Sequence, residues 1–180
     1  MIDIQKEIEK KFPNMEKKEN FLKKSLFKIA KKIVHEDSIN QFLSQNAHLK
    51  GFEFVDAALD YFDFDYAISS NDLQNIPTSG KVVIIANHPL GGLDALCLLR
   101  LIGQIRKDVK IIANDFLAGF EALNSLIITI DNYKLKQSKS DIKKIYDALN
   151  NEEAIIIFPA SLFFWKIFWV EKWADVLVYV

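Results

Sequence analysis

The stretch KVVIIANHPLGGLD, residues 81–94, decides the fold of this chain. Its first half, Val82–Ala86, is a continuous run of apolar, mostly β-branched residues, which is typical of a strand covered on both faces. The run ends in a polar turn with two glycines, whose backbones reach conformations closed to other residues. An apolar helical pattern follows over Leu93–Ile105. The stretch therefore predicts a buried strand, a tight turn and a helix in that order.

The alternation of strands and helices continues as far as residue 158. An amphipathic pattern predicts a helix over residues 137–149, and a short helix with a loop is expected over residues 115–124. Because strands alternate with helices, we expect the α/β class, a largely parallel sheet flanked by helices. The apolar runs that predict further strands are residues 110–113, 126–130 and 154–158.

Upstream of the sheet, helical patterns dominate. Residues 38–62 predict one or two helices, with Gly51 between them. The alternating string FDFDYAI then predicts a short half-buried strand over Phe64–Ile68. We therefore expect an N-terminal helical region over residues 1–63 and an α/β domain over residues 64–160.

Residues 15–36 predict a basic amphipathic helix. Over residues 1–36 the ten lysines exceed the six acidic residues, a net charge of +4. Such a helix either lies on an anionic membrane surface, or docks its stripe on the core and leaves its lysines solvated. Its apolar stripe comprises Phe21, Leu22, Leu26, Ile29, Ala30, Ile33 and Val34.

The composition excludes several classes of protein. The 180 residues suit one domain, or one domain with an appendage, and 50% hydrophobic content excludes a wholly disordered chain. A net charge of −1 argues against a surface devoted to nucleic acid. The single cysteine, Cys97, excludes an intrachain disulfide, and three histidines with one cysteine form no zinc pattern, so no metal is expected. With neither a secretion signal nor a clear transmembrane stretch, we expect a cytosolic or membrane-surface protein.

The turn after the first buried strand carries the chemistry. In open parallel sheets, ligands bind beyond the carboxyl ends of the strands, which here points to residues 87–94, 114–116, 131–134 and 159–161. Asp94 falls in the first turn of a helix and can orient one ring nitrogen of His88, which leaves the other nitrogen free as a general base. Taken alone, the pair favours the other interpretation, in which Asp94 caps a helix and His88 is a satisfied loop histidine.

The complete string, a strand followed by NHPLGGLD and a helix, with FPA at 158–160, resembles the glycerolipid acyltransferase family. This family includes lysophosphatidate acyltransferases, and the chain is most similar to its bacterial haemolysin-like or ornithine-lipid acyltransferase branch. The resemblance covers residues 64–160. It implies that His88 deprotonates a lysolipid hydroxyl and that Asp94 orients His88. The acyl donor would be a thioester of acyl carrier protein or coenzyme A, attacked directly without an acyl-enzyme or a cofactor.

The resemblance also marks the residues expected to hold substrate. Asn87 is either a donor in the site or a turn residue, and Lys134 is either a point charge for the acceptor or an exposed loop lysine. The family's second and third sequence blocks carry arginines that this chain lacks, which favours an uncharged or zwitterionic acceptor over lysophosphatidate. The expected substrate-binding set is Asn87, Gly91, Gly92, Lys134, Phe158, Pro159 and Ala160.

Residues 161–180 form an atypical tail, with all three tryptophans between Trp165 and Trp173. The tail is either the product of a frameshift or degraded gene, or a native segment that anchors the protein to a membrane or a partner. We expect a peripheral enzyme at the cytoplasmic face of the membrane that acylates a lysolipid. The alternatives are an inactive acyltransferase remnant that binds membranes or a partner, and a hydrolase in which His88 activates water.

Overall fold

The computed structural model describes residues 36–87, 92–114, 117–130, 138–158 and 176–179, with backbone only at residues 36, 118 and 176–179. Two compact units divide the chain, Met1–His48 and Leu49–Val180. In the first unit, helix α3 spans Glu36–Gln45 and buries Phe42. The amide of Asn46 donates to the Phe42 carbonyl at 3.0 Å and closes the end of this helix. The predicted basic helix over residues 15–36 lies almost entirely outside the described residues.

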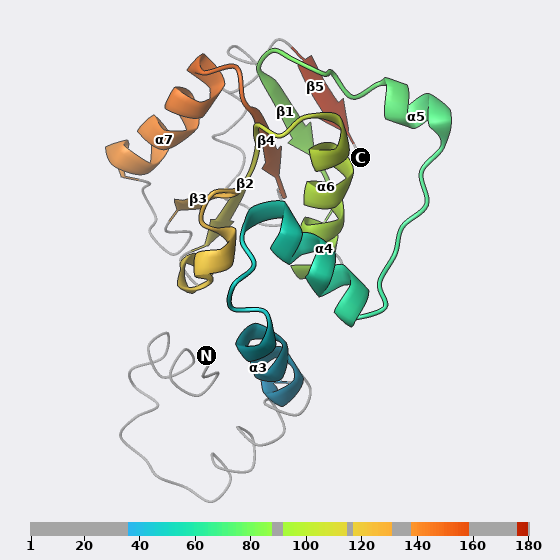
Figure 1. The fold of residues 1–180 in the computed structure, drawn as a ribbon. Helices are drawn as coiled ribbons and strands as arrows, with labels where there is room; N and C mark the ends of the chain where they lie inside the picture. The colour runs from blue at the N-terminus through green and yellow to red at the C-terminus, as the bar shows by residue number, and fades with distance from the viewer. Residues whose placement is uncertain (1–35, 88–91, 115–116, 131–137, 159–175, 180) are drawn as a thin grey trace, which may run out of the picture. The chain divides into compact units, whose positions relative to one another are not determined.

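The second unit is built on a parallel sheet of five strands in the order β3-β2-β4-β1-β5 (Figure 1). The prediction of a parallel α/β fold is confirmed, and β1 to β4 match the four predicted strand segments to within one residue at each end. The fifth strand, which the sequence did not predict, comes from the Trp-rich tail and pairs with β1, with Val82 beside Val176. The strands are β1 Val82–Ile85, β2 Val109–Asn114, β3 Ile127–Ile130, β4 Ala154–Ile157 and β5 Val176–Tyr179.

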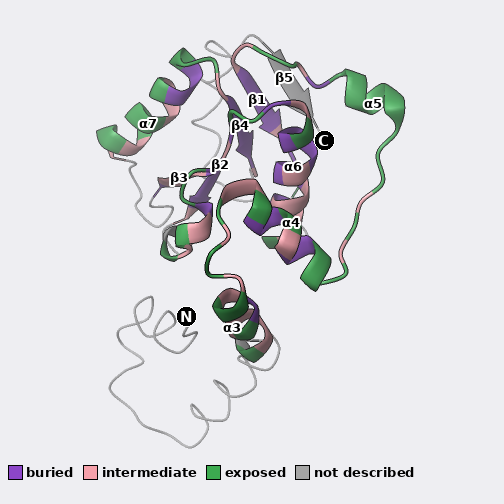
Figure 2. Ribbon diagram, viewed as in Figure 1, coloured by how far each residue is buried: buried purple, intermediate pink, exposed green. Residues whose placement is uncertain are grey.

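One face of the sheet is covered by helix α7, Lys139–Asn150. Ser138 caps the start of the helix, because its hydroxyl accepts a hydrogen bond from the backbone N–H of Asp141 at 3.1 Å. Ala148 and Leu149 pack there on isoleucines and a valine of four strands, and these side chains form one apolar cluster. Figure 2 shows that the helix buries a single stripe and leaves its outer side exposed. The strand residues in this cluster are Val83, Ile112, Ile128, Ile130, Ile155 and Ile157.

Helices α6, Gly92–Ile105, and α4, Gly51–Tyr61, lie on the other side of the sheet (Figure 1). The two helices approach so closely that a Cβ at Gly103 would overlap the ring of Phe52. Glycine at this position in α6 therefore sets how near α4 can come. This contact places α4 in the same compact unit as the sheet, whereas the sequence-based boundary after residue 63 stays a prediction.

The strand predicted over Phe64–Ile68 is wrong. The alternation is present, since Phe64 and Tyr66 are half-buried and Asp65 is exposed, but the segment joins no neighbouring strand. It runs instead past α4 and α6 and leads into the short helix α5, Ser70–Gln74. Alternating polarity reveals half-burial, but a helical surface can produce it as well as a sheet.

Short 3-10 turns occupy the segment where a short helix and a loop were predicted. They are η2, Leu117–Gly119, and η3, Glu121–Leu123. They join the carboxyl end of β2 to the amino end of β3, and η3 lies against α4. This prediction is therefore confirmed.

A buried arginine, Arg106, connects the turns at the amino ends of β1, β2 and β4. Arg106 follows α6, is 5% exposed, and binds the carboxylate of Asp108 through Nε at 2.7 Å and Nη2 at 2.8 Å. The same guanidinium donates to the carbonyls of Glu152 at 2.7 Å and Pro77 at 3.3 Å. These contacts tie together the turns that precede β2, β4 and β1. A polar network thus holds together the amino ends of these strands, whereas the motif loops follow their carboxyl ends.

Candidate active site

The two motif segments begin at neighbouring strands. β1 and β4 pair in register, Ile85 with Ile157, and the Ala86 backbone N–H donates to the Ile157 carbonyl at 3.2 Å. The two strands are parallel neighbours in the sheet, so their carboxyl ends lie side by side. Ligands of open α/β sheets bind outside the carboxyl ends of the strands. The loops at 87–94 and 158–160 both start at this end of the sheet.

Four predicted site residues lie among the described residues. Asn87 is the second residue after β1 and is exposed, and Phe158 directly follows β4 and is half-buried. Gly92 opens helix α6 with no atom near its Cβ position, and Asp94 is half-buried in the first turn of this helix. The strand pairing therefore brings Asn87 and Phe158 to adjacent positions, with Asp94 one helical turn into α6. His88, Gly91, Lys134, Pro159 and Ala160 lie outside the described residues, so the pairing of His88 with Asp94 stays a prediction.

The carboxylate of Asp94 acts on the thiol one turn further along α6. Burial raises the pKa of Cys97 above its ordinary value of 9.0, and the negative charge of Asp94 raises it further. Arg100 opposes the shift, while Asp65 adds to it. The thiol therefore stays protonated at neutral pH and is a poor nucleophile. This agrees with direct attack on the acyl donor without an acyl-enzyme at this cysteine.

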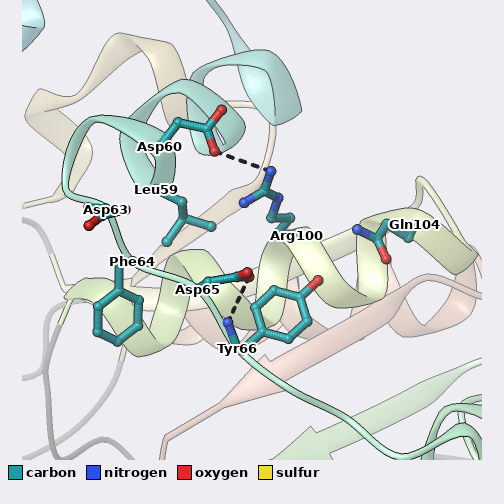
Figure 3. Close-up of a pocket in the computed structure, with 8 residues that line it drawn as sticks. All are labelled: Leu59, Asp60, Asp63, Phe64, Asp65, Tyr66, Arg100 and Gln104. Atoms are coloured by element: carbon teal, nitrogen blue, oxygen red, sulfur yellow. Dashed lines mark hydrogen bonds and ion pairs between the residues drawn. The ribbon is translucent and has the colours of Figure 1, made fainter.

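A separate polar hollow of about 440 Å³ lies beside α4 and α6 (Figure 3). Arg100 reaches from α6 to two carboxylates of α4, Asp56 at 3.0 Å and Asp60 at 3.3 Å. Burial raises the pKa of Tyr66 above 10.0 although Arg100 lowers it, so the phenol stays protonated at neutral pH. The hollow is lined by Leu59, Asp60, Asp63, Phe64, Asp65, Tyr66, Arg100 and Gln104.

This hollow does not carry the chemistry expected at the strand ends. Three aspartates and one arginine, Arg100, line the hollow, and Arg100 already forms ion pairs with carboxylates of α4. The hollow therefore has an excess of negative charge and repels anionic groups. None of the predicted site residues lines it. The sequence analysis missed it because its residues come from two separate stretches, 59–66 and 100–104. The only local signal was the alternating FDFDY string, which we interpreted as a strand.

Among the residues that the structure describes, no group of three or more His, Cys, Asp or Glu side chains is arranged to hold a metal ion. Within the same residues, no helix is both long and apolar enough to cross a membrane.

Comparison with known proteins identifies the family to which the chain belongs. Residues 8–170 match the profile of a family described as acyltransferase, so the chain belongs to this acyltransferase family. The predicted resemblance to lysolipid acyltransferases is thereby confirmed. The match also extends beyond residues 64–160, into the N-terminal region and into the first part of the Trp-rich tail.

Two relatives carry the same name, lyso-glycine lipid O-acyltransferase. The protein from Bacteroides thetaiotaomicron is 31% identical over 163 residues, which cover 90% of this chain and 58% of the relative. The protein from Phocaeicola vulgatus is 32% identical over 163 residues, 90% of this chain and 56% of the relative. The chain thus spans a little more than half the length of these relatives. No solved structure matches it.

Proposed function

We propose that this chain transfers a fatty acyl group from a thioester donor to the hydroxyl of a lysolipid. The observation that carries the proposal is that both motif loops start side by side, at the carboxyl ends of the adjacent parallel strands β1 and β4. Membership of the acyltransferase family and the names of the two relatives support the same reaction.

In the proposed mechanism, His88 is the general base and Asp94 its orienting carboxylate. His88 takes the proton of the acceptor hydroxyl as the oxygen attacks the thioester carbonyl, so a C–O bond forms. The C–S bond then breaks, and the leaving thiolate receives the proton from His88. General-base assistance of this kind contributes roughly 10²- to 10⁴-fold to the rate. The position of Asp94 in the first turn of α6 supports its role, because the positive end of the helix dipole stabilises a carboxylate there.

The proposed donor is acyl carrier protein or coenzyme A carrying the acyl thioester, and no bound cofactor takes part. The proposed acceptor is an amino-acid lysolipid of the glycine type, after the names of the relatives. The sequence supports an acceptor without a phosphate, because residues 131–134 and 158–164 contain no arginine. Arginine is the side chain that binds phosphate in bidentate fashion.

We also propose that the protein works at the cytoplasmic face of a membrane, as a peripheral protein. The lysine-rich amphipathic sequence over residues 15–36 supports this location, since lysolipid acceptors reside in bilayers. The apolar stripe would enter the interface, while the lysines would meet anionic head groups.

The test is an acylation assay with the purified 180-residue chain, an acyl thioester and a hydroxylated N-acylglycine lysolipid. Free thiol and the acylated lipid are measured together, the lipid by mass spectrometry. We expect both to appear only when the lysolipid is present. His88→Ala should abolish the reaction with an unchanged circular dichroism spectrum, whereas His48→Ala, at an exposed position in the other compact unit, should leave it intact. Thiol release without lysolipid would indicate a hydrolase, and release of neither product would indicate an inactive chain.

A further inference from the structure

The polar hollow beside α4 and α6 takes no part in the proposed reaction, yet its size suits a small molecule. Its volume of about 440 Å³ falls within the range of roughly 300–1,000 Å³ that small-molecule sites occupy. Figure 3 shows that its side chains come from the end of α4, from the segment that follows α4, and from α6. Because α4 and α6 pack closely at Gly103, the frame of the hollow is fixed.

The lining offers both acceptors and donors of hydrogen bonds. Asp65 accepts from the backbone N–H of Tyr66 through Oδ1, at 2.8 Å, which leaves Oδ2 without a bond in the part of the chain that the structure describes. Asp60 likewise uses Oδ1 to accept from Arg100, at 3.3 Å. The donors are the guanidinium of Arg100, the amide of Gln104 and the phenol of Tyr66, whose pKa is raised by burial.

The charges of the lining favour an uncharged ligand. An anion is repelled by the three aspartates. A cation would meet the guanidinium of Arg100, which already forms ion pairs with Asp56 at 3.0 Å and Asp60 at 3.3 Å. A hydroxyl avoids both costs, because it donates to a carboxylate and accepts from a guanidinium, an amide or a phenol.

Aromatic rings form the apolar part of the hollow. Phe64 and Tyr66 are half-buried and line it together with Leu59. A sugar ring has the complementary chemistry, since its C–H groups form an apolar face that packs on aromatic rings, while its hydroxyls need donors and acceptors around the edge. The lining therefore combines the two features that a polyhydroxylated ring requires.

We propose that the hollow is a binding site for a sugar ring or a similar uncharged polyol, separate from the site of acyl transfer. The ring packs on Phe64 and Tyr66. Its hydroxyls donate to the carboxylates of the lining and accept from Arg100 and Gln104. The sugar is either free in solution or the head group of a glycolipid, which presents the same chemistry. The inference goes beyond the proposed function, because none of these residues belongs to a motif loop.

The test is binding of two kinds of probe to the full 180-residue chain. The soluble probes are myo-inositol and the methyl glycosides of glucose, galactose and mannose, and their binding is measured by saturation-transfer NMR. The lipid probes are glucosyl and galactosyl diacylglycerol in phosphatidylcholine vesicles, measured by sedimentation against vesicles without glycolipid. We expect binding in at least one arm, and the arm that responds identifies the source of the sugar.

Substitutions of Tyr66 show whether the probes occupy the hollow. Tyr66→Ala removes the ring on which the sugar packs and should weaken binding about tenfold. Tyr66→Phe keeps the ring and removes one hydrogen-bonding group, so the loss should be about two- to fivefold. The matched control is Tyr61→Ala, because Tyr61 is the last residue of α4, is 41% exposed and is not among the residues that line the hollow. This control should leave the affinity unchanged, and the melting temperature of each variant is measured alongside.

Salt and Asp65→Asn distinguish a sugar from an organic cation. Asparagine keeps an acceptor oxygen, so sugar binding should fall less than about threefold and should stay constant between about 0.1 and 1 M salt. Binding of choline in place of every sugar, weakened by salt and by Asp65→Asn, would overturn the inference. So would the absence of binding in both arms, or binding that Tyr66→Ala leaves unchanged. Acyl transfer is assayed separately, so a chain that binds sugar but transfers no acyl group contradicts only the proposed function.

Discussion

Replacing Arg106 by leucine should be the most destabilising single change outside the apolar core that we describe. The guanidinium makes two charge-assisted bonds to Asp108 and donates to two backbone carbonyls, those of Glu152 and Pro77. Leucine replaces part of the buried stem but removes all four bonds. The carbonyls then lose charged donors while lying near the buried starts of β4 and β1.

The loss of unfolding free energy depends on how far water can replace each of the four hydrogen bonds. Removing one partner of a fully buried ion pair costs about 3–5 kcal/mol. The Asp108 side chain is 46% exposed, so water can take over much of its share. With hydrogen bonds to charged groups worth about 1.5–3 kcal/mol each, the two carbonyls dominate, and we expect a loss of about 3 kcal/mol. For a chain of this size, that corresponds to a melting temperature lower by roughly 6–12 °C.

The assay is urea unfolding at pH 7, followed by circular dichroism, with Arg100→Leu as the matched control. Arg100 also binds two aspartates, but those side chains are 52% and 69% exposed, and such surface pairs contribute about 1 kcal/mol or less. Acyl transfer per folded molecule should survive Arg106→Leu, because the network lies at the amino edge of the sheet. A loss below 1 kcal/mol, or one equal to that of Arg100→Leu, would refute this reasoning.

Three other predictions test separate parts of the structure. The hydrogen bond from Arg106 holds the pKa of Asp108 below 3.8, so Asp108 stabilises the fold above that pH and loses this effect as the pH falls through the lowered pKa. The stability difference between the unchanged chain and Asp108→Asn, measured by urea unfolding, should therefore shrink below pH 4; a constant difference contradicts it. Gly103→Ala should cost about 1–3 kcal/mol by overlap with the Phe52 ring, and Phe52→Leu should recover part of this loss; additive losses would exclude the overlap. Binding to anionic vesicles in a sedimentation assay should weaken by about 1 kcal/mol per lysine when lysines of the basic segment become glutamate, and unchanged binding would contradict membrane contact. The lysines to change are Lys23, Lys24, Lys31 and Lys32.

Local patterns of apolar residues predicted the elements whose burial depends only on a short stretch of sequence. The β-branched runs at Val82–Ala86 and 154–158 became β1 and β4, because strands buried on both faces need apolar side chains at every position. Helix α7 begins two residues from its expected start, since Ser138 and Asp141 provide a capping pair just before it. Sheet order and register depend on pairing between distant segments, so no local pattern could supply them.

The same limit explains what was missed at the site. The position of Asp94 in the first turn of a helix after a buried strand could be predicted from the motif. The pairing of β1 with β4, which brings the starts of the two motif loops side by side, depends on contacts between distant segments. The charged string RKD at 106–108 has no local feature that indicates burial, yet Arg106 is buried and donates to carbonyls 29 and 46 residues away along the chain. The apolar run near the end of the tail could not be distinguished from the aromatic-rich sequence before it, so no strand was predicted there. Val176–Tyr179 nevertheless pairs with β1.

The placement of β4 at the centre of the sheet has a consequence for how the chain is made. β1 emerges from the ribosome early, but both of its neighbours, β4 and β5, are synthesised at least 68 residues later. Until then Val82–Ile85 is an apolar strand with two unpaired edges, the kind of segment that associates with other chains. Pairing across such separations also slows folding, because closing the long loop costs conformational entropy before any contact between the strands stabilises the chain. We therefore expect newly made chains to depend on chaperones until residue 157 has been translated.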